Sequence, residues 1–223
     1  MRDATPAEAR VRGEVLRLHP ERAVLWEHTR TLIVADTHFG KAATFRAHGV
    51  PVPHGTTHAS LQRLDVLLER THAARILFLG DFLHARAGRA PATLDAIEQW
   101  RFRHGTVEMV LVRGNHDREA GDPPASLGIT CVDAPMIEAP FVLTHHPAES
   151  PLGYVIAGHV HPGVTLRGRA RMRARLPCFR IGAAGAVLPA FGDFTGMAEI
   201  EPADGDRVFV IAGTEVVQVV GAG

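Results

Sequence analysis

The sequence predicts an α/β protein in which two packed β-sheets carry helices on the outside. Short apolar runs, each the length of a buried strand, alternate with helical patterns along most of the chain. The C-terminal part then switches to strand signals. No long linker, repeat or low-complexity tract divides the 223 residues, so we expect one domain over residues 1–223.

The strands are expected at apolar runs that are too short for helices. Five of these runs are the best candidates for strands buried on both faces: Thr31–Ala35, Arg75–Leu79, Glu108–Val112, Phe141–Thr144 and Tyr154–Ala157. An N-terminal pair precedes them at Glu14–Leu18 and Ala23–Trp26. The C-terminal strands are expected at Arg167–Leu176, Arg180–Gly182, Met197–Glu201, Val208–Ala212 and Val216–Val220.

Three helices are expected between the strands. The first long one runs from about Thr56 to Arg70 and places leucines on one face. The second runs from Pro91 to about Arg103, with a proline where a first helical turn accepts one. A weaker helical pattern covers Phe39–His48.

Composition narrows the class of protein. The formal net charge is zero, so no global field favours nucleic acid or a membrane surface. Cys131 and Cys178 form no metal-binding spacing, and no apolar run reaches the roughly 20 residues that span a bilayer. The N-terminal segment "MRDATPAEAR" does not have the pattern of a signal peptide. We therefore expect a cytoplasmic protein without a membrane partner.

Polar clusters follow the apolar runs, where open α/β sheets bind their ligands. Each cluster alone could be a helix cap, a turn or a solvated loop. Together they form a mixed nitrogen and oxygen set without thiolates, which suits Mn²⁺, Fe²⁺ or Zn²⁺ and is large enough for two ions that share a carboxylate. The clusters are "ADTHFG" (Asp36, His38), "LGDF" (Asp81), "RGNHD" (Asn115, His116, Asp117), "LTHHP" (His145, His146) and "AGHVHP" (His159, His161).

This order of motifs (D-x-H, G-D, G-N-H-D, a further His, then G-H-x-H) resembles the calcineurin-like metallophosphoesterases. The resemblance implies two facing mixed β-sheets flanked by helices, an αββα sandwich, with two metal ions at the strand ends. It also implies ligand roles. One ion would be held by Asp36, His38 and His161; the other by Asn115, His159 and one of His145 and His146, with His145 preferred and His146 as a neighbour; Asp81 would bridge both.

His116 and Asp117 of "GNHD" are the expected catalytic residues. His116 would donate to a phosphate oxygen or to the leaving group, and Asp117 would orient its ring and favour its protonated form. The alternative for Asp117 is a local Asx turn. Two metal ions would lower the pKa of a bridging water, so that hydroxide attacks phosphorus in line with the departing oxygen.

Basic side chains could bind substrate phosphates. Lys41, the only lysine, Arg46 and Arg118 follow the metal-binding motifs, although solvated positions explain them equally well. A period-two series of arginines could place its guanidinium groups on one face of a strand and follow a nucleic-acid backbone. Otherwise it is a half-exposed strand whose charges pair with carboxylates. The series is Arg167, Arg169, Arg171, Arg173 and Arg175.

Three longer blocks narrow the resemblance to one bacterial clade. "ADTHFGKAATFRAHGVPVPHGTT", "GNHDREAGDPP" and "LPAFGDFTG" resemble the ligase-associated DNA damage response metallophosphoesterases, over about residues 13–220. The resemblance implies a manganese-dependent endonuclease that cuts DNA internally, with single-stranded DNA as the expected partner and a role in DNA repair. It further suggests a functional association with an Lhr-type helicase, an ATP-dependent DNA ligase and an exonuclease, and a homodimer.

Two other functions compete with this interpretation. A phosphomonoesterase or nucleotide phosphoesterase would use the same two metals, but it would need a closed pocket, and no inserted cap segment is evident. A metal-free scaffold would be expected to lack some of the ligand motifs, whereas all of them are complete.

Overall fold

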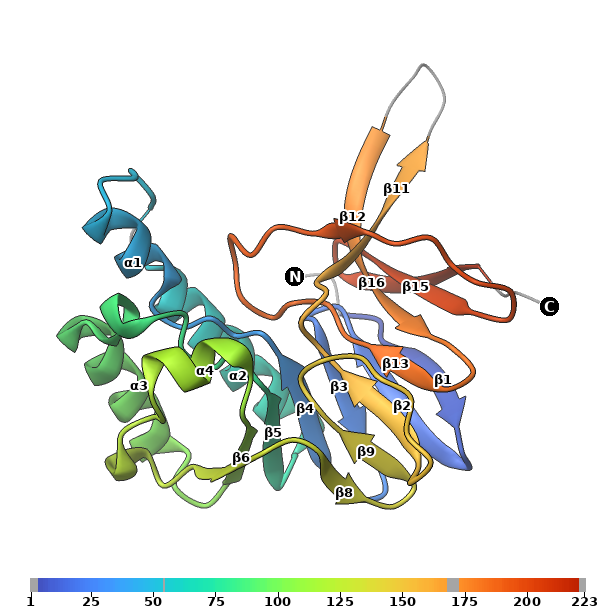
Figure 1. The fold of residues 1–223 in the computed structure, drawn as a ribbon, viewed down its shortest axis with the longest axis horizontal. Helices are drawn as coiled ribbons and strands as arrows, with labels where there is room; N and C mark the ends of the chain where they lie inside the picture. Colours follow the sequence, from blue (N-terminus) through green and yellow to red (C-terminus); the bar gives the residue numbers. More distant parts are fainter. Residues whose placement is uncertain (1–3, 54, 168–172, 221–223) are drawn as a thin grey trace.

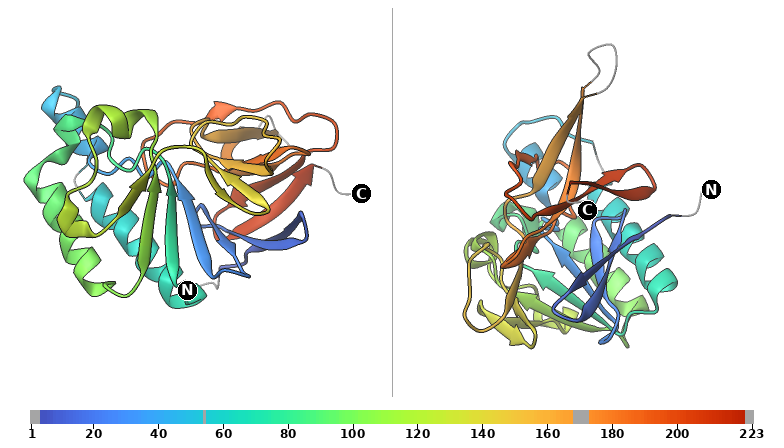
Figure 2. Two further views of the ribbon diagram at one scale, coloured as in Figure 1. Left: turned by 60° about the horizontal axis from the view of Figure 1, so that its bottom comes forward. Right: turned by 90° about the vertical axis from the view of Figure 1, so that its right-hand side faces the viewer.

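The structure is a computed structural model that describes residues 4–53, 55–167 and 173–220. It contains two mixed β-sheets packed face to face, with helices against the outer face of the first (Figures 1 and 2). This arrangement confirms the predicted fold of two facing mixed sheets flanked by helices. In the described part of the chain, no helix is both long and apolar enough to cross a membrane.

The first sheet follows the order of the chain from β1 to β7. Its N-terminal strands are antiparallel hairpins, whereas β4 to β7 are parallel. The strands are β1 (Ala7–Val11), β2 (Glu14–His19), β3 (Ala23–Trp26), β4 (Thr31–Ala35), β5 (Arg75–Leu79), β6 (Glu108–Val112) and β7 (Thr130–Val132).

The second sheet has the order β14-β11-β12-β13-β10-β9-β8, and β15 and β16 extend it from β12. Its strands β9, β10 and β13 are parallel neighbours. The strands are β8 (Met136–Glu138), β9 (Phe141–Leu143), β10 (Tyr154–Ala157), β11 (Pro162–Arg167), β12 (Arg173–Ile181), β13 (Gly185–Val187), β14 (Ala198–Glu199), β15 (Arg207–Ala212) and β16 (Glu215–Val220).

Alternation along the central strands divides the core into two layers. On β4, Ile33 points into the cluster between the sheets, and Leu32 points into the cluster beneath the helices. On β5, Leu77 belongs to the cluster between the sheets and Phe78 to the cluster beneath the helices. A strand buried on both faces reads as a continuous apolar run, which is why the sequence predicts β4, β5 and β6 with their observed bounds.

The helices cover the outer face of the first sheet. Leu64 and Leu67 of α2 and Trp100 of α3 belong to the same buried cluster as the outward face of β5. The helices are α1 (Lys41–Ala47), α2 (Thr56–Thr71), α3 (Pro91–Arg103) and α4 (Asn115–Ala120), with short 3₁₀ turns η1 (Arg86–Arg89) and η2 (Ala125–Leu127). All three predicted helices are confirmed to within a few residues, and α4 was not predicted.

One predicted strand is wrong. The range Arg167–Leu176 is not a single strand, because β11 ends at Arg167 and β12 begins at Arg173, and the two run antiparallel. The described parts of this hairpin project from the body of the molecule (Figures 1 and 2). Strands β1, β7, β8, β11 and β13 were not predicted; β7, β8 and β13 have three residues each, too few to show a period. The predicted strand Arg180–Gly182 is the end of β12 rather than a separate strand.

Candidate metal centre

The polar motifs converge at one edge of the two sheets. Asp36, Asp81 and Asn115 follow the carboxyl ends of β4, β5 and β6, which are neighbouring parallel strands. His145 and His159 follow β9 and β10 of the facing sheet in the same way. The fold therefore brings together residues that are more than a hundred positions apart in the sequence, such as Asp36 and His159, whose backbone N–H donates to Asp36 Oδ2 at 2.8 Å.

The first group consists of Asp36, His38 and His161. One ligand atom from each lies within 4.8 Å of the others. His161 donates from Nδ1 to the Thr195 carbonyl at 3.1 Å, which turns its Nε2 toward Asp36 Oδ1, 3.5 Å away. Each side chain thus presents a free nitrogen or oxygen to a common point.

The second group gathers around His145, which is 1% exposed. Its Nδ1–H donates to the Leu79 carbonyl at 3.0 Å, so Nε2 faces the site. This Nε2 lies 3.0 Å from Asn115 Oδ1 and 3.0 Å from His159 Nδ1. His146 also offers a ring nitrogen within 4.8 Å of His145 and His159, but its side chain is exposed at the rim. The geometry makes His145 the better anchored of the tandem pair.

Asp81 lies between the two groups. Its Oδ1 is 3.4 Å from His145 Nε2, and its Oδ2 is 3.7 Å from His38 Nε2. Asp81 is buried, and burial raises the pKa of its carboxyl group, so a nearby positive charge would stabilise the ionised form. A carboxylate in this position can serve both groups at once.

The chemistry of these residues fits bound divalent cations. Asp36 Oδ1 and His38 Nε2 are buried and have no hydrogen-bond partner among the described residues, an arrangement that is costly unless something else satisfies them. Burial lowers the pKa of His38 and of His159, which keeps both imidazoles neutral, the form that binds metals. A cation bound between these two atoms would give each of them a partner.

The backbone at the centre is strained. Five of the predicted ligands have a positive φ between 44° and 67°, a region that non-glycine residues seldom adopt. They are Asp36, His38, Asp81, His159 and His161. Close packing accompanies this conformation: Gly80 has φ +75°, and a Cβ there would lie 2.3 Å from His145 Nδ1. Such outliers concentrate at functional sites, where the surrounding structure holds them.

His116 lies at the rim of the centre, with 32% of its side chain exposed. Its Nδ1–H donates to the His84 carbonyl at 2.6 Å, and its Nε2 lies 3.9 Å from Asp81 Oδ2. The His84 ring stacks on that of His116 at 4.9 Å between centroids, and its Nδ1 is 3.3 Å from His38 Nδ1. Burial lowers the pKa of His84 to about 4. His84 was not predicted, because a single histidine in "FLHAR" shows no pattern until the fold places it here.

Asp117 has other hydrogen-bond partners than the predicted one. Its carboxylate does not contact the His116 ring, which the His84 carbonyl holds instead. Asp117 is buried and accepts backbone N–H groups from Gly114 at 2.9 Å and from Phe82 at 2.9 Å. Burial is also the main cause that raises the pKa of its carboxyl group. Asp117 therefore ties the loop after β5 to the start of α4, which positions Asp81 and Asn115. Its bond to the Gly114 N–H, three residues earlier, is that of a capping box and not of the Asx turn given as the alternative.

The predicted basic residues divide by location. Lys41 is half-buried near the centre; burial lowers the pKa of its ammonium group, and the charges of Asp81 and Asp36 act to raise it. Arg118 is exposed on α4, close enough for its charge to help lower the pKa of His146, where burial is the larger cause. Arg46 donates to the Pro53 carbonyl at 3.2 Å and closes the segment after α1, so its contacts do not join it to the centre.

The described members of the arginine series do not lie on one strand. Arg167 ends β11 and is the direct cross-strand partner of Arg173 on β12. Arg169 and Arg171 lie outside the described residues. Arg175 forms an ion pair with Glu199 at 3.3 Å, as the alternative of paired surface charges expects.

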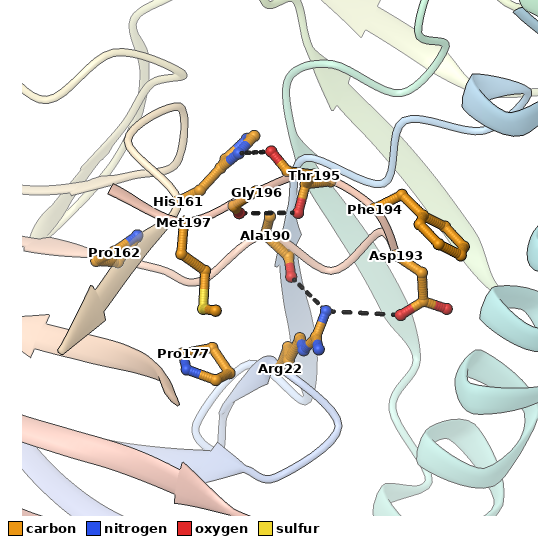
Figure 3. A pocket seen from close by; sticks show the side chains of 10 residues that line it. All are labelled: Arg22, His161, Pro162, Pro177, Ala190, Asp193, Phe194, Thr195, Gly196 and Met197. Atoms are coloured by element: carbon orange, nitrogen blue, oxygen red, sulfur yellow. Dashed lines mark hydrogen bonds and ion pairs between the residues drawn. The ribbon is translucent and has the colours of Figure 1, made fainter. Parts of the chain in front are cut away.

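A loop between β13 and β14 borders the centre on the His161 side (Figure 3). It overlies a cavity of about 140 Å³ whose walls include Arg22, Pro162, Pro177 and Met197. Phe194, at the tip of this loop, is 50% exposed. The loop contains most of the block "LPAFGDFTG", whose residues have no role predicted from the sequence.

Comparisons with known proteins agree with this site. The family described as Calcineurin-like phosphoesterase matches residues 29–140, which include the first three motifs. The chain belongs to the calcineurin-like phosphoesterase family. A search among curated proteins gave no match.

Among solved structures, this phosphoesterase is similar to nuclease MPE from Pseudomonas putida. The two share 46% sequence identity over 96% of this chain and 100% of that chain, with a TM-score of 0.86. Protein AQ665 from Aquifex aeolicus, of unknown function, is 19% identical over 59% and 78% of the two chains, with a TM-score of 0.39. The phosphoesterase Yfce from E. coli is 14% identical over 82% and 88%, with a TM-score of 0.38. The protein is thus a metallophosphoesterase, a hydrolase that acts on phosphoester bonds and uses divalent metal ions.

Proposed function

We propose that the protein is an endonuclease that hydrolyses phosphodiester bonds within DNA, with two divalent metal ions at the candidate centre. The observation that carries this proposal is the 46% identity to a nuclease over nearly the whole length of both chains. The convergence of the seven predicted ligands at one sheet edge supports it. In this assignment Asp36, His38 and His161 hold one ion, and Asn115, His145 and His159 hold the other.

Asp81 lies between the two groups and would bridge them. The bound ions would supply Lewis-acid stabilisation of the charge on the phosphoryl group and a water acidic enough to act at neutral pH. The chain itself holds the ligands in place: the Leu79 and Thr195 carbonyls fix the tautomers of His145 and His161, so that both present Nε2 to the site.

His116 would assist the departing oxygen. Because its Nδ1–H is held by the His84 carbonyl, the ring turns Nε2 toward the centre. A protonated Nε2 can donate to a phosphoryl oxygen or to the leaving group. Lys41, beside Asp36 and Asp81, would attract a further phosphate of the substrate, and Arg118 would do so on the His146 side.

An open site favours a polymer over a small phosphomonoester. His146 and Arg118 are exposed at the rim, and His116 is one-third exposed. The cavity beside His161 holds about 140 Å³, whereas pockets that enclose small-molecule ligands hold about 300–1,000 Å³. A strand of DNA can lie across such a centre without being enclosed.

The remaining parts of the proposal rest on the sequence resemblance. Manganese is the proposed metal, although these nitrogen and oxygen ligands also accept Fe²⁺ or Zn²⁺. Single-stranded DNA is the proposed partner. We further propose that the protein acts in DNA repair in the cytoplasm, in functional association with an Lhr-type helicase, an ATP-dependent DNA ligase and an exonuclease, and that it forms a homodimer.

Nicking of closed circular DNA tests the proposal. Metal-stripped protein is supplied with Mn²⁺ and incubated with single-stranded and double-stranded circles, beside an Asp81→Ala variant and a phosphomonoester. Manganese-dependent opening of circles by the wild type alone is expected, and closed circles exclude a contaminating exonuclease. Intact circles together with rapid hydrolysis of the monoester would replace the proposal with a small-molecule phosphatase.

A further inference from the structure

We propose that Phe194 is the base-stacking platform of this site, on which a nucleobase next to the scissile phosphate lies. The inference rests on the proposed nuclease function and deepens it by naming the contact that recognises a base rather than a phosphate. Three features of Phe194 support it: the exposed ring, the strained backbone, and the hydrogen bonds that attach its loop to the candidate metal ligands.

The Phe194 side chain is exposed without an evident structural reason. It is 50% exposed, whereas the nearby Phe191 is fully buried in the core beneath the helices. Its backbone has φ +60°, a conformation that bulky residues rarely adopt. An outlier of this kind persists only where surrounding contacts impose it, and it often marks a functional position.

The loop that carries Phe194 is fixed to both halves of the first ligand group. Gly192 N–H donates to the Asp36 carbonyl at 3.0 Å, and a Cβ at Gly192 would lie 2.4 Å from the Thr37 carbonyl oxygen. On the other side of Phe194, the Thr195 carbonyl accepts the Nδ1–H of His161. The loop therefore holds Phe194 between a hydrogen bond to Asp36 and a hydrogen bond to His161, both of which are predicted metal ligands.

Two arginines form hydrogen bonds that hold the same loop in place. Arg63 donates to Asp193 Oδ1 at 3.0 Å, and Arg22 donates to the Gly192 carbonyl at 3.2 Å. Figure 3 shows the contacts of Arg22 with Asp193 and with the Ala190 carbonyl, and Phe194 next to Asp193 at the border of the cavity. A rigid loop presents the ring at little further entropic cost, which is what a stacking surface requires.

The exposed ring fits a nucleobase better than the cavity does. The cavity beneath the loop is small, and Arg22 and Asp193 line it while pairing with each other. A phenyl ring, by contrast, accepts any base, because every base has a π-face, so it binds single-stranded nucleic acid without requiring one sequence. The site would thus combine phosphate contacts at Lys41 and the metal ions with one aromatic contact to a base.

Two substrates of equal length separate stacking from phosphate binding: single-stranded oligothymidylate, and an oligomer of abasic deoxyribose-phosphate residues. Both are assayed with the manganese-loaded protein. We expect the wild type to favour oligothymidylate in kcat/KM by roughly 5- to 150-fold, the equivalent of one stacked base. In Phe194→Ala this preference should fall to near one, chiefly through KM, because stacking binds the ground state and the transition state alike.

Three further variants sharpen the result. Phe194→Leu keeps apolar bulk without a ring and should resemble Phe194→Ala, whereas Phe194→Trp should restore the preference. Phe102→Ala removes an 88% exposed phenylalanine from α3 and serves as the matched control. Metal content per chain, measured by elemental analysis, reports whether the loop still supports His161.

The possible failures are distinguishable. Equal base preference in the wild type and Phe194→Ala, with DNA still cut, would overturn the platform and leave the nuclease proposal intact. A wild-type level of preference in Phe194→Leu would also overturn it, because apolar bulk alone would then suffice. If the wild type cuts neither oligomer while it hydrolyses a monoester, the proposed nuclease function fails, and the platform fails with it.

Discussion

Replacing Asp117 by Asn should weaken the fold without changing the assistance that His116 gives to the leaving group. The carboxylate accepts N–H groups from Gly114 at 2.9 Å and from Phe82 at 2.9 Å. An amide can accept on only one side, so its NH₂ group would face one of these donors. A buried hydrogen bond left unmade costs about 1–3 kcal/mol. For a chain of this length, a loss of about 2 kcal/mol lowers Tm by roughly 4–8 °C.

The assay compares Asp117→Asn with Glu119→Gln, which removes an exposed carboxylate from the same helix and should change stability by no more than about 0.5 kcal/mol. Thermal unfolding gives Tm, and the rates of hydrolysis of two phosphodiesters, one with a good and one with a poor leaving group, report whether His116 still assists the departing oxygen. Since the His84 carbonyl holds the His116 ring, the ratio of the two rates should stay as in the wild type. An unchanged Tm with selectively slowed hydrolysis of the diester with the poor leaving group would refute this reasoning and restore Asp117 as the residue that orients His116.

Three other predictions follow from the same geometry. His116→Ala should retain metal by elemental analysis but slow hydrolysis most for diesters with poor leaving groups, by roughly 10²–10⁴-fold; full activity would remove the role assigned to it. His145→Ala should lower the metal content, whereas His146→Ala should keep it, and the reverse result would exchange their roles. Burial lowers the pKa of His19, 3% exposed, to about 4, so its protonation opposes folding. Above pH 6.5 His19 is neutral in both states and does not reduce the free energy of unfolding. As the pH drops from 6.5 toward 4, the free energy of unfolding decreases by at most roughly 3 kcal/mol. Urea unfolding of the wild type and His19→Leu should therefore diverge across that range; parallel curves would contradict the assignment.

The sequence could predict the parts of the structure that carry a strong local pattern. Strand β5 and helix α3 were predicted with their observed bounds, because a doubly buried strand and a proline-initiated amphipathic helix both leave clear signals. Strand β1 was missed, since Ala9 and Val11 are its only buried residues, too few to form a recognisable apolar run. The short strands of the second sheet are fixed by their neighbours rather than by their own residues.

The candidate site divides in the same way. Residues that belong to dense motifs, such as Asp36 and His161, could be selected from the sequence and do lie together. His84 and Phe194 could not, because their importance depends on which distant segment each one meets. Asp117 shows the opposite limit: proximity in sequence to His116 suggested a contact, but the helix that starts at Asn115 turns the two side chains in different directions.

The left-handed backbone of the candidate ligands has a consequence for how the centre assembles. Each such residue costs about 1–2 kcal/mol, and an unfolded chain rarely adopts the conformation at Asp36, Asp81 and His159 together. The unfolded chain therefore offers a metal ion no preformed binding site. In small zinc domains, by contrast, binding of the ion drives folding. The two buried cores must form first and impose the backbone on the ligands. Metal loading is then a late and reversible step, and the stripped protein should remain folded and ready to accept whichever suitable cation the cell supplies.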